Sequence, residues 1–161
     1  MNDKQQELIW PGTIAAIQLR ERDPILLSSR IEVDSRRVFY ALSLAEYIEA
    51  WLRAPAQEEV LVFGFVTPER FQIDLYREDA PRASIHGSAR VVNKSQVIYS
   101  WKTISPYGIT HTAVDLVLLG GMDRCVVGLK HTGFSNMRER AWHHEMWKRS
   151  MAKLSELVTT H

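Results

Sequence analysis

The chain has 161 residues, of which 45% are hydrophobic and 24% charged, and its 20 Lys and Arg against 19 Asp and Glu give a formal net charge of +1. This length suits one compact domain with a substantial core. Because the charges of both signs are interspersed and nearly cancel, the chain offers no bulk attraction to nucleic acid, and we expect no nucleic-acid partner.

The single cysteine, Cys125, lies in an apolar, strand-like run and cannot form an internal disulfide, which is typical of a reducing compartment. The polar start of the chain lacks the apolar region of a signal peptide, and no apolar stretch approaches the length that crosses a bilayer. We therefore expect a cytoplasmic protein without membrane insertion.

Residues 1–24 carry only a weak pattern, broken by Pro11 and Gly12. We expect an N-terminal arm over residues 1–24 and a single domain over residues 25–161. The arm is too apolar for a plain tail, so we expect it to pack on a second copy of the chain in a homodimer. Its apolar residues include Ile9, Trp10, Ile14, Ile17 and Leu19.

The first element of the domain is a strand, predicted by the apolar and β-branched residues from Ile25 to Val33. Asp34 offers an N-cap for a first short helix. Ser43 and Glu46 stand three apart in a capping-box pattern, which predicts a second short helix that ends before Pro55.

The pattern then alternates with a period of two, as half-buried strands do. Turn-like residues separate the runs, so short strands follow one another in an antiparallel meander. The six runs begin at Val60 and continue over Phe71–Leu75, Ser84–Val92, Gln96–Lys102, Thr110–Leu119 and Cys125–Thr132.

A long helix closes the chain. Asn136 and Glu139 are suited to cap its start, and apolar residues recur on one face from Arg140 onward. With about 20 residues, or roughly 30 Å, it is the element long enough to cover one face of a bent sheet. The order of elements predicts an α+β helix-grip fold, with a cavity between the sheet and the long helix.

Four stretches carry a resemblance to a known family. They are the strand and helices of Ile31–Pro55, with their "VF-x-AL" and "W-L" patterns, the Ser-Trp strand end of Gln96–Trp101, the "L-x-H-x-G-F" end of Leu129–Phe134, and the final helix through Trp147, Met151 and Leu154. In these stretches the chain resembles the START-like helix-grip (SRPBCC) superfamily and, within it, the family named for the activator of the heat-shock protein 90 ATPase. The resemblance implies a curved sheet wrapped around the C-terminal helix.

The chain departs from that family at three places. Met146 stands where the family usually has a glycine before the helix tryptophan, and Glu78–Pro81 replaces a Gly-Gly turn. The arm of residues 1–24 is far too short for the separate chaperone-binding domain of the eukaryotic activator. Ligands and chaperone activity are therefore not carried over from relatives.

The histidines of the final helix suggest a metal site at first. His143 and His144 precede a glutamate, as in His-Glu-x-x-His zinc motifs, but Lys148 stands where the second helical ligand belongs. We therefore expect no metal and no cofactor.

Two readings stay open for the inward-facing His131 and Trp147: buried core residues satisfied by hydrogen bonds, or polar and aromatic walls of a ligand cavity. His143 is placed for the cavity mouth, whereas His111 and Asp115 should lie outside and His86 fits either side of the sheet. The residues that we predict to line the cavity are Trp51, Phe71, Ile73, Tyr99, Trp101, Val114, Leu116, Leu129, His131, His143, Met146, Trp147 and Met151.

Three functions follow from these patterns. Non-catalytic binding of a small apolar or amphipathic molecule is the first, because the sequence shows no nucleophile motif and Cys125 reads as buried filler. The second is a chaperone-linked, stress-response interaction protein. The third is a cyclase- or hydrolase-like enzyme acting through His131 and a neighbouring tyrosine.

Overall fold

The structure, a computed structural model, describes residues 23–160. The predicted N-terminal arm, and with it the expected homodimer contact, lies almost entirely outside the described residues. The elements in chain order are β1 (Ile25–Ile31), α2 (Ser35–Ser43), the 3-10 turn η1 (Ala45–Tyr47), α3 (Ile48–Trp51), β2 (Glu59–Thr67), β3 (Arg70–Arg77), β4 (Ala80–Asn93), β5 (Gln96–Ser105), β6 (Gly108–Gly120), β7 (Cys125–Thr132) and α4 (Met137–Thr159).

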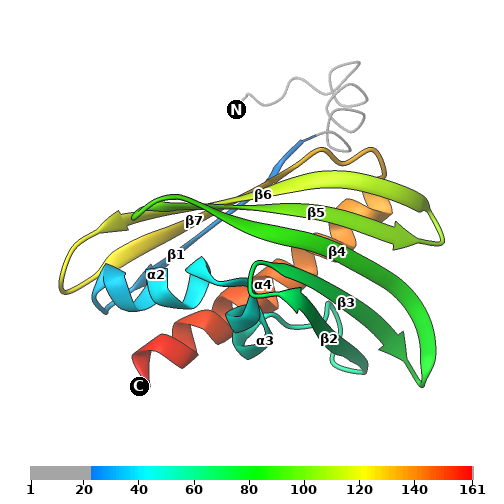
Figure 1. The fold of residues 1–161 in the computed structure, drawn as a ribbon, viewed down its shortest axis with the longest axis horizontal. Coiled ribbons are helices and arrows are strands. Elements are labelled where there is room, and N and C mark those ends of the chain that lie inside the picture. Colours follow the sequence, from blue (N-terminus) through cyan, green and yellow to red (C-terminus); the bar gives the residue numbers. More distant parts are fainter. Residues whose placement is uncertain (1–22, 161) are drawn as a thin grey trace, which may run out of the picture.

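The seven strands form one antiparallel sheet in the order β1-β7-β6-β5-β4-β3-β2. The six strands after the short helices pair as a meander, and β1 joins the last of them, with Ile25 opposite His131 and Ile31 opposite Cys125. In Figure 1 the long helix α4 runs along one face of this sheet, while α2 and α3 close one end. The predicted α+β helix-grip architecture is confirmed.

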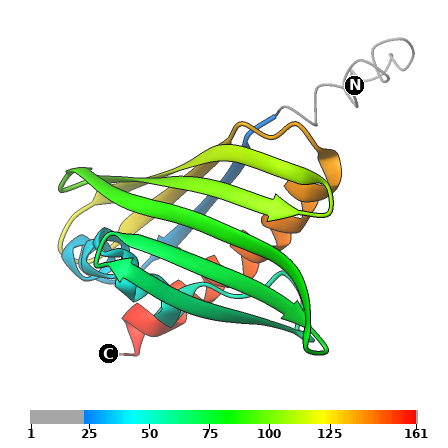
Figure 2. The same ribbon diagram turned by 45° about the vertical axis from the view of Figure 1, so that its right-hand side comes forward.

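The sheet curves around α4, and Figure 2 shows β2, β3 and β4 bending toward the helix. Gly87 lies at a point of close approach in β4, because a Cβ there would run into the carbonyl oxygen of Ser100 and the ring of Phe71. A glycine is the residue that such close backbone contact requires.

Two of the three predicted helix starts are confirmed. The Asp34 carboxylate accepts from the N–H of Arg36 at 2.8 Å, and the Asn136 side chain accepts from the N–H of Glu139 at 3.0 Å. The capping box at Ser43 is wrong. Ser43 is the last residue of α2 and its hydroxyl donates to the carbonyl of Tyr40, so the next turn starts at Leu44 without a side-chain cap.

The turn between β3 and β4 replaces the glycine pair of the resembling family with charged residues. Glu78 and Asp79 have φ of 52° and 65°, and Arg77 pairs with Ala80 across them. Positive φ at both central residues is what a tight type I′ hairpin turn needs. The backbone conformation of the turn is therefore kept although neither residue is glycine.

Candidate functional site

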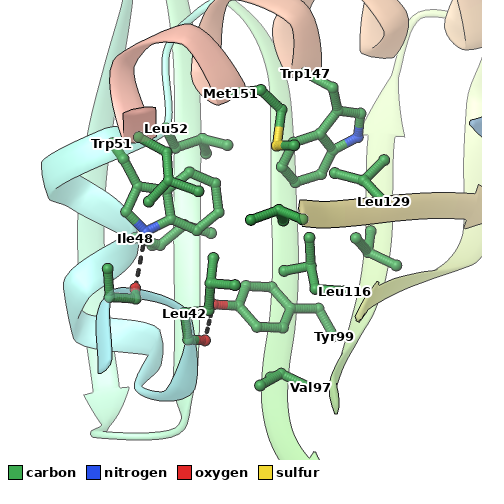
Figure 3. Close-up of a cluster of buried hydrophobic side chains, with 14 of the residues drawn as sticks. Leu42, Ile48, Trp51, Leu52, Val97, Tyr99, Leu116, Leu129, Trp147 and Met151 are labelled. Atoms are coloured by element: carbon green, nitrogen blue, oxygen red, sulfur yellow. Dashed lines mark hydrogen bonds between the residues drawn. The ribbon is translucent and has the colours of Figure 1, made fainter. Parts of the chain in front are cut away.

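The thirteen side chains predicted to line a cavity come together between the sheet and α4. Each of them exposes 5% of its surface or less. Figure 3 shows Tyr99, Leu116 and Leu129 of the sheet facing Trp147 and Met151 of α4, with Trp51 and Leu52 at the side. Side chains of the sheet and of α4 thus meet in one buried cluster, and their contact with a ligand stays a prediction.

Aromatic rings fill the space at the centre of this cluster. The ring of Trp147 lies 5.2 Å from that of Trp101 and 6.3 Å from that of Trp51, measured between centroids. Trp101 in turn stacks on Tyr99 at 6.5 Å and meets Phe71 edge-on at 5.6 Å. Rings in such contact form a packed core, so this part of the space between the sheet and α4 is filled by the protein's own side chains.

His131 lies in the middle of this core with both ring nitrogens engaged. The indole N–H of Trp147 donates to its Nδ1 at 2.9 Å. An indole can only donate, so the imidazole proton is on Nε2 and is donated to the hydroxyl of Thr112 at 2.7 Å. That hydroxyl donates onward to the carbonyl of Trp101 at 2.9 Å. The chain of hydrogen bonds is complete with a neutral His131.

His143 is also fully buried and is satisfied in the opposite tautomer. Its Nδ1 lies 2.8 Å from the carbonyl oxygen of Glu139 and donates to it, so Nε2 accepts. The indole N–H of Trp101 supplies that bond at 3.1 Å, and the Thr103 hydroxyl lies 3.4 Å from the same nitrogen. The position is deeper than the cavity mouth to which the sequence assigned this histidine.

Burial disfavours the charged form of both imidazoles. It lowers the pKa of His143 to about 3, although the hydrogen bond to the Glu139 carbonyl acts the other way. It also holds the pKa of His131 well below its ordinary value, with a smaller contribution from the neighbouring His143. Two neutral histidines whose four ring nitrogens are all hydrogen-bonded favour the core reading of this pair.

Neither a metal site nor a free catalytic pair is found around these histidines in the part of the chain that the structure describes. Residues 23–160 contain no group of three or more His, Cys, Asp or Glu side chains arranged to hold a metal ion. The Tyr99 hydroxyl donates to the carbonyl of Leu42 at 2.9 Å, and burial raises the pKa of this tyrosine. His131, on which the enzymatic alternative rested together with a neighbouring tyrosine, and the buried Tyr99 are therefore both committed to structural hydrogen bonds.

A small pocket opens where the first turn of α4 faces the end of the sheet. Its volume is about 90 Å³, and we call it the rim pocket. Helix α4 contributes Glu139 and Trp142, and the β5–β6 turn contributes Tyr107. Its lining residues are Glu59, Leu75, Arg82, Ala83, Ser105, Pro106, Tyr107, Glu139 and Trp142.

Glu139 is the chemically unusual residue of the rim pocket. It exposes only 2% of its surface; its Oε2 accepts from the Ser105 hydroxyl at 3.3 Å, while its Oε1 is buried with no partner among the described residues. Burial raises the pKa of this carboxyl, opposed by the hydroxyls of Thr110 and Ser105. A buried oxygen without a hydrogen bond costs free energy, which a ligand that donates to it would recover.

Sequence reasoning recognised Glu139 only as a capping residue. Its burial depends on the β5–β6 turn, which brings Ser105 and Tyr107 over the start of α4. The nearest signal in the sequence was the position of Trp142, an aromatic residue about one helical turn after Glu139 and off the main apolar face of the helix. That signal identifies a side chain at an edge and not a pocket.

The remaining candidates lie where the strand pattern put them. His111 is exposed on the outer face of the sheet, and Asp115 on the same face accepts from the Gln96 amide at 2.9 Å instead of pairing with it. His86, left open by the sequence, is half-buried on that face with Nε2 2.9 Å from the Ser84 hydroxyl. Cys125 is buried in β7, as predicted.

The helix-grip fold of this chain is also found in several solved structures. Protein CV1439 from Chromobacterium violaceum matches with a TM-score of 0.69 at 13% identity, over 84% of this chain and 96% of that one. The AHSA1 protein (SPO3351) from Silicibacter pomeroyi matches with a TM-score of 0.65 at 16% identity, over 86% and 99%. At such identities the likeness confirms the predicted fold.

A third structure is similar over part of its length. DynU16, from the dynemicin biosynthetic locus, matches with a TM-score of 0.57 at 13% identity, over 86% of this chain and 48% of DynU16. No family model matches the chain, and no curated protein is similar to it in sequence. Within residues 23–160, no helix is long and apolar enough to cross a membrane.

Proposed function

We propose that the protein binds a small amphipathic molecule at the rim pocket, with the apolar part against Trp142 and Leu75 and a hydroxyl or amine donating to Glu139. The observation that carries this proposal is the buried Oε1 of Glu139, which has no hydrogen-bond partner in the part of the chain that the structure describes. The walls of the pocket also include aromatic and aliphatic side chains. Binding without catalysis agrees with the full hydrogen bonding of His131 and His143.

The size of the rim pocket limits the ligand. Sites for drug-sized molecules have volumes of about 300 to 1,000 Å³, several times the 90 Å³ seen here. The pocket therefore accepts one end of a ligand, such as a short alkyl or aromatic group bearing a hydroxyl. The rest of the ligand extends over the half-buried Trp142 toward solvent.

A titration with short-chain primary alcohols tests this function directly. Octanol should shift the indole N–H resonance of Trp142 saturably, and Glu139→Leu should weaken that binding by about tenfold because a hydrogen bond to a charged group is worth about 1.5 to 3 kcal/mol. Glu145→Leu is the matched control, since Glu145 is an exposed glutamate of the same helix that pairs with Lys148. Non-saturable shifts, or equal weakening by both variants, would reject the proposal.

The natural ligand can be sought without assuming its identity. Native protein purified under mild conditions is extracted, and the extract is compared by mass spectrometry with that of the Glu139→Leu variant. We expect a small amphipathic compound that accompanies the native protein and is depleted in the variant. A compound retained equally by both proteins would place the ligand elsewhere.

A further inference from the structure

The outer face of the sheet, opposite α4, carries a hollow of about 380 Å³ that none of the functions above uses. Its walls come from five neighbouring strands, β2 to β6, and we call it the outer hollow. The lining residues are Val66, Arg70, Phe71, Gln72, His86, Gly87, Ser88, Ser100, Trp101, Lys102, His111 and Thr112. None of them is acidic, although acidic residues number 19 in the chain.

Strand register aligns the polar residues of the outer hollow in a row. Gln72 is opposite His86, His86 is opposite Lys102, and Lys102 is opposite His111. Neighbouring strands are about 4.8 Å apart, so the row places a nitrogen-bearing side chain at every step over about 14 Å. Four donor side chains thus stand side by side on one face.

The floor of the outer hollow consists of small hydroxyl side chains from the adjacent row. Ser88 is opposite Ser100, and their hydroxyl oxygens lie 2.9 Å apart. Arg70 stands opposite Ser88 from the other side and adds a second permanent cation. Small residues between longer ones make the depression, and the hydroxyls add donors at its base.

Within the described part of the chain, the cations of the outer hollow are not neutralised by carboxylates. Among residues 23–160, neither Arg70 nor Lys102 has a carboxylate within salt-bridge distance. A carboxylate does lie near, because Asp74 follows Gln72 by two residues in β3 and accepts from its amide at 3.2 Å. Asp74 belongs to the neighbouring row of outward-facing residues and does not line the hollow. Unpaired cations in a concave site concentrate positive potential there.

We propose that the outer hollow is a binding site for a small molecule bearing oxyanion groups, phosphate or carboxylate. Lys102 and Arg70 supply the charge, His86 and His111 donate at either side, and the serine hydroxyls hydrogen-bond the anion from below. A metal ion does not suit the row, because the two imidazoles are separated by a full strand that carries the lysine between them. The near-neutral chain and the concave shape favour a small molecule over nucleic acid.

The test uses pyrophosphate as the probe, followed through backbone amide resonances of the full chain at low salt. We expect saturable shifts at Gly87, Ser88 and Ser100, and an affinity that Lys102→Gln lowers by about tenfold through loss of a charge-assisted hydrogen bond. Lys130→Gln is the matched control. Lys130 lies in β7 on the same outer face of the sheet as Lys102 but outside the hollow, so its substitution removes the same charge. Its effect should stay within about twofold.

Several outcomes decide the inference. Absence of saturation, or equal weakening by the two lysine variants, would mean bulk charge attraction and would overturn it. Citrate titrated in parallel distinguishes the two sources of oxyanion, since tighter binding of pyrophosphate assigns phosphate and tighter binding of citrate assigns carboxylate. Glu139→Leu should leave pyrophosphate affinity unchanged, which separates this site from the rim pocket. Melting temperatures of the lysine variants confirm that they are folded.

Discussion

Two regions between the sheet and α4, the centre around His131 and His143 and the rim pocket around Glu139, use buried polar groups in opposite ways. At the centre, His131 and His143 engage all four ring nitrogens in hydrogen bonds with indoles, a hydroxyl and a carbonyl. At the rim, Glu139 is almost as deeply buried, but one of its carboxyl oxygens has no hydrogen-bond partner among residues 23–160. A satisfied network fixes a unique packing, whereas an unsatisfied group retains capacity for a partner from outside.

The most severe change to the centre is the removal of its largest ring. Trp147→Ala should lower the free energy of unfolding by about 3 to 5 kcal/mol, because it leaves a cavity and deprives His131 of its donor. Chemical denaturation measures this loss. Trp142→Ala, at the half-buried rim, is the control and should cost clearly less. Equal losses would mean that centre and rim are packed alike.

Acid should destabilise the centre through its histidines. A histidine of lowered pKa binds its proton in the unfolded chain first, so its contribution is fully present above about pH 6.5 and is lost as the pH falls toward the folded-state pKa, about 3 for His143. Between pH 6.5 and 5 this amounts to about 2 kcal/mol for a fully buried histidine. Urea unfolding at successive pH values measures the slope.

In the same titration, Glu139 changes the free energy of unfolding with pH in the direction opposite to the histidines. Its raised pKa means that the folded state holds the proton longer, so its contribution is present at low pH and is lost as the pH rises through the folded-state value. Glu139→Gln should therefore steepen the acid-side slope caused by the histidines. An unchanged slope in this variant would contradict the raised pKa.

The hydroxyl of Thr112 tests whether the central network needs every member. Thr112→Val keeps the shape of the side chain but leaves the Nε2–H of His131 without an acceptor, which should cost about 1 to 3 kcal/mol. Thr112→Ser retains the hydroxyl and is the control, with a smaller loss from the missing methyl group. If the valine variant were as stable as the serine variant, the hydrogen bond would carry no weight.

The sequence predicted the architecture better than the site, and the physical reason differs between the two. Strand period, the Asp34 and Asn136 caps and the apolar face of the last helix are local signals, and the structure confirms them. The failed capping box at Ser43 shows the limit of a local motif, because Ser43 was taken up by the preceding helix.

The candidate sites depend on groups distant in sequence. That His131 faces inward follows from the alternation of β7, but its pairing with Trp147 and Thr112 needs the tertiary arrangement. The rim pocket forms only because the β5–β6 turn lies over the start of α4. The row of polar residues in the outer hollow forms only because four strands pair in the observed register. Spacing along one element carries no information on which elements meet.

The smallest expected effect reports on the rim. Glu139→Gln replaces a buried carboxyl by an uncharged side chain of the same shape, and it should raise the free energy of unfolding at neutral pH by about 1 kcal/mol, because an incompletely paired buried charge is costly. Glu145→Gln, on the exposed side of the same helix, should change stability by less than about 0.5 kcal/mol. A gain in stability that accompanies a loss of octanol binding would show that Glu139 is kept for a ligand at the expense of the fold. A loss in both would instead make Glu139 part of the packed structure, and the contrast between centre and rim would then disappear.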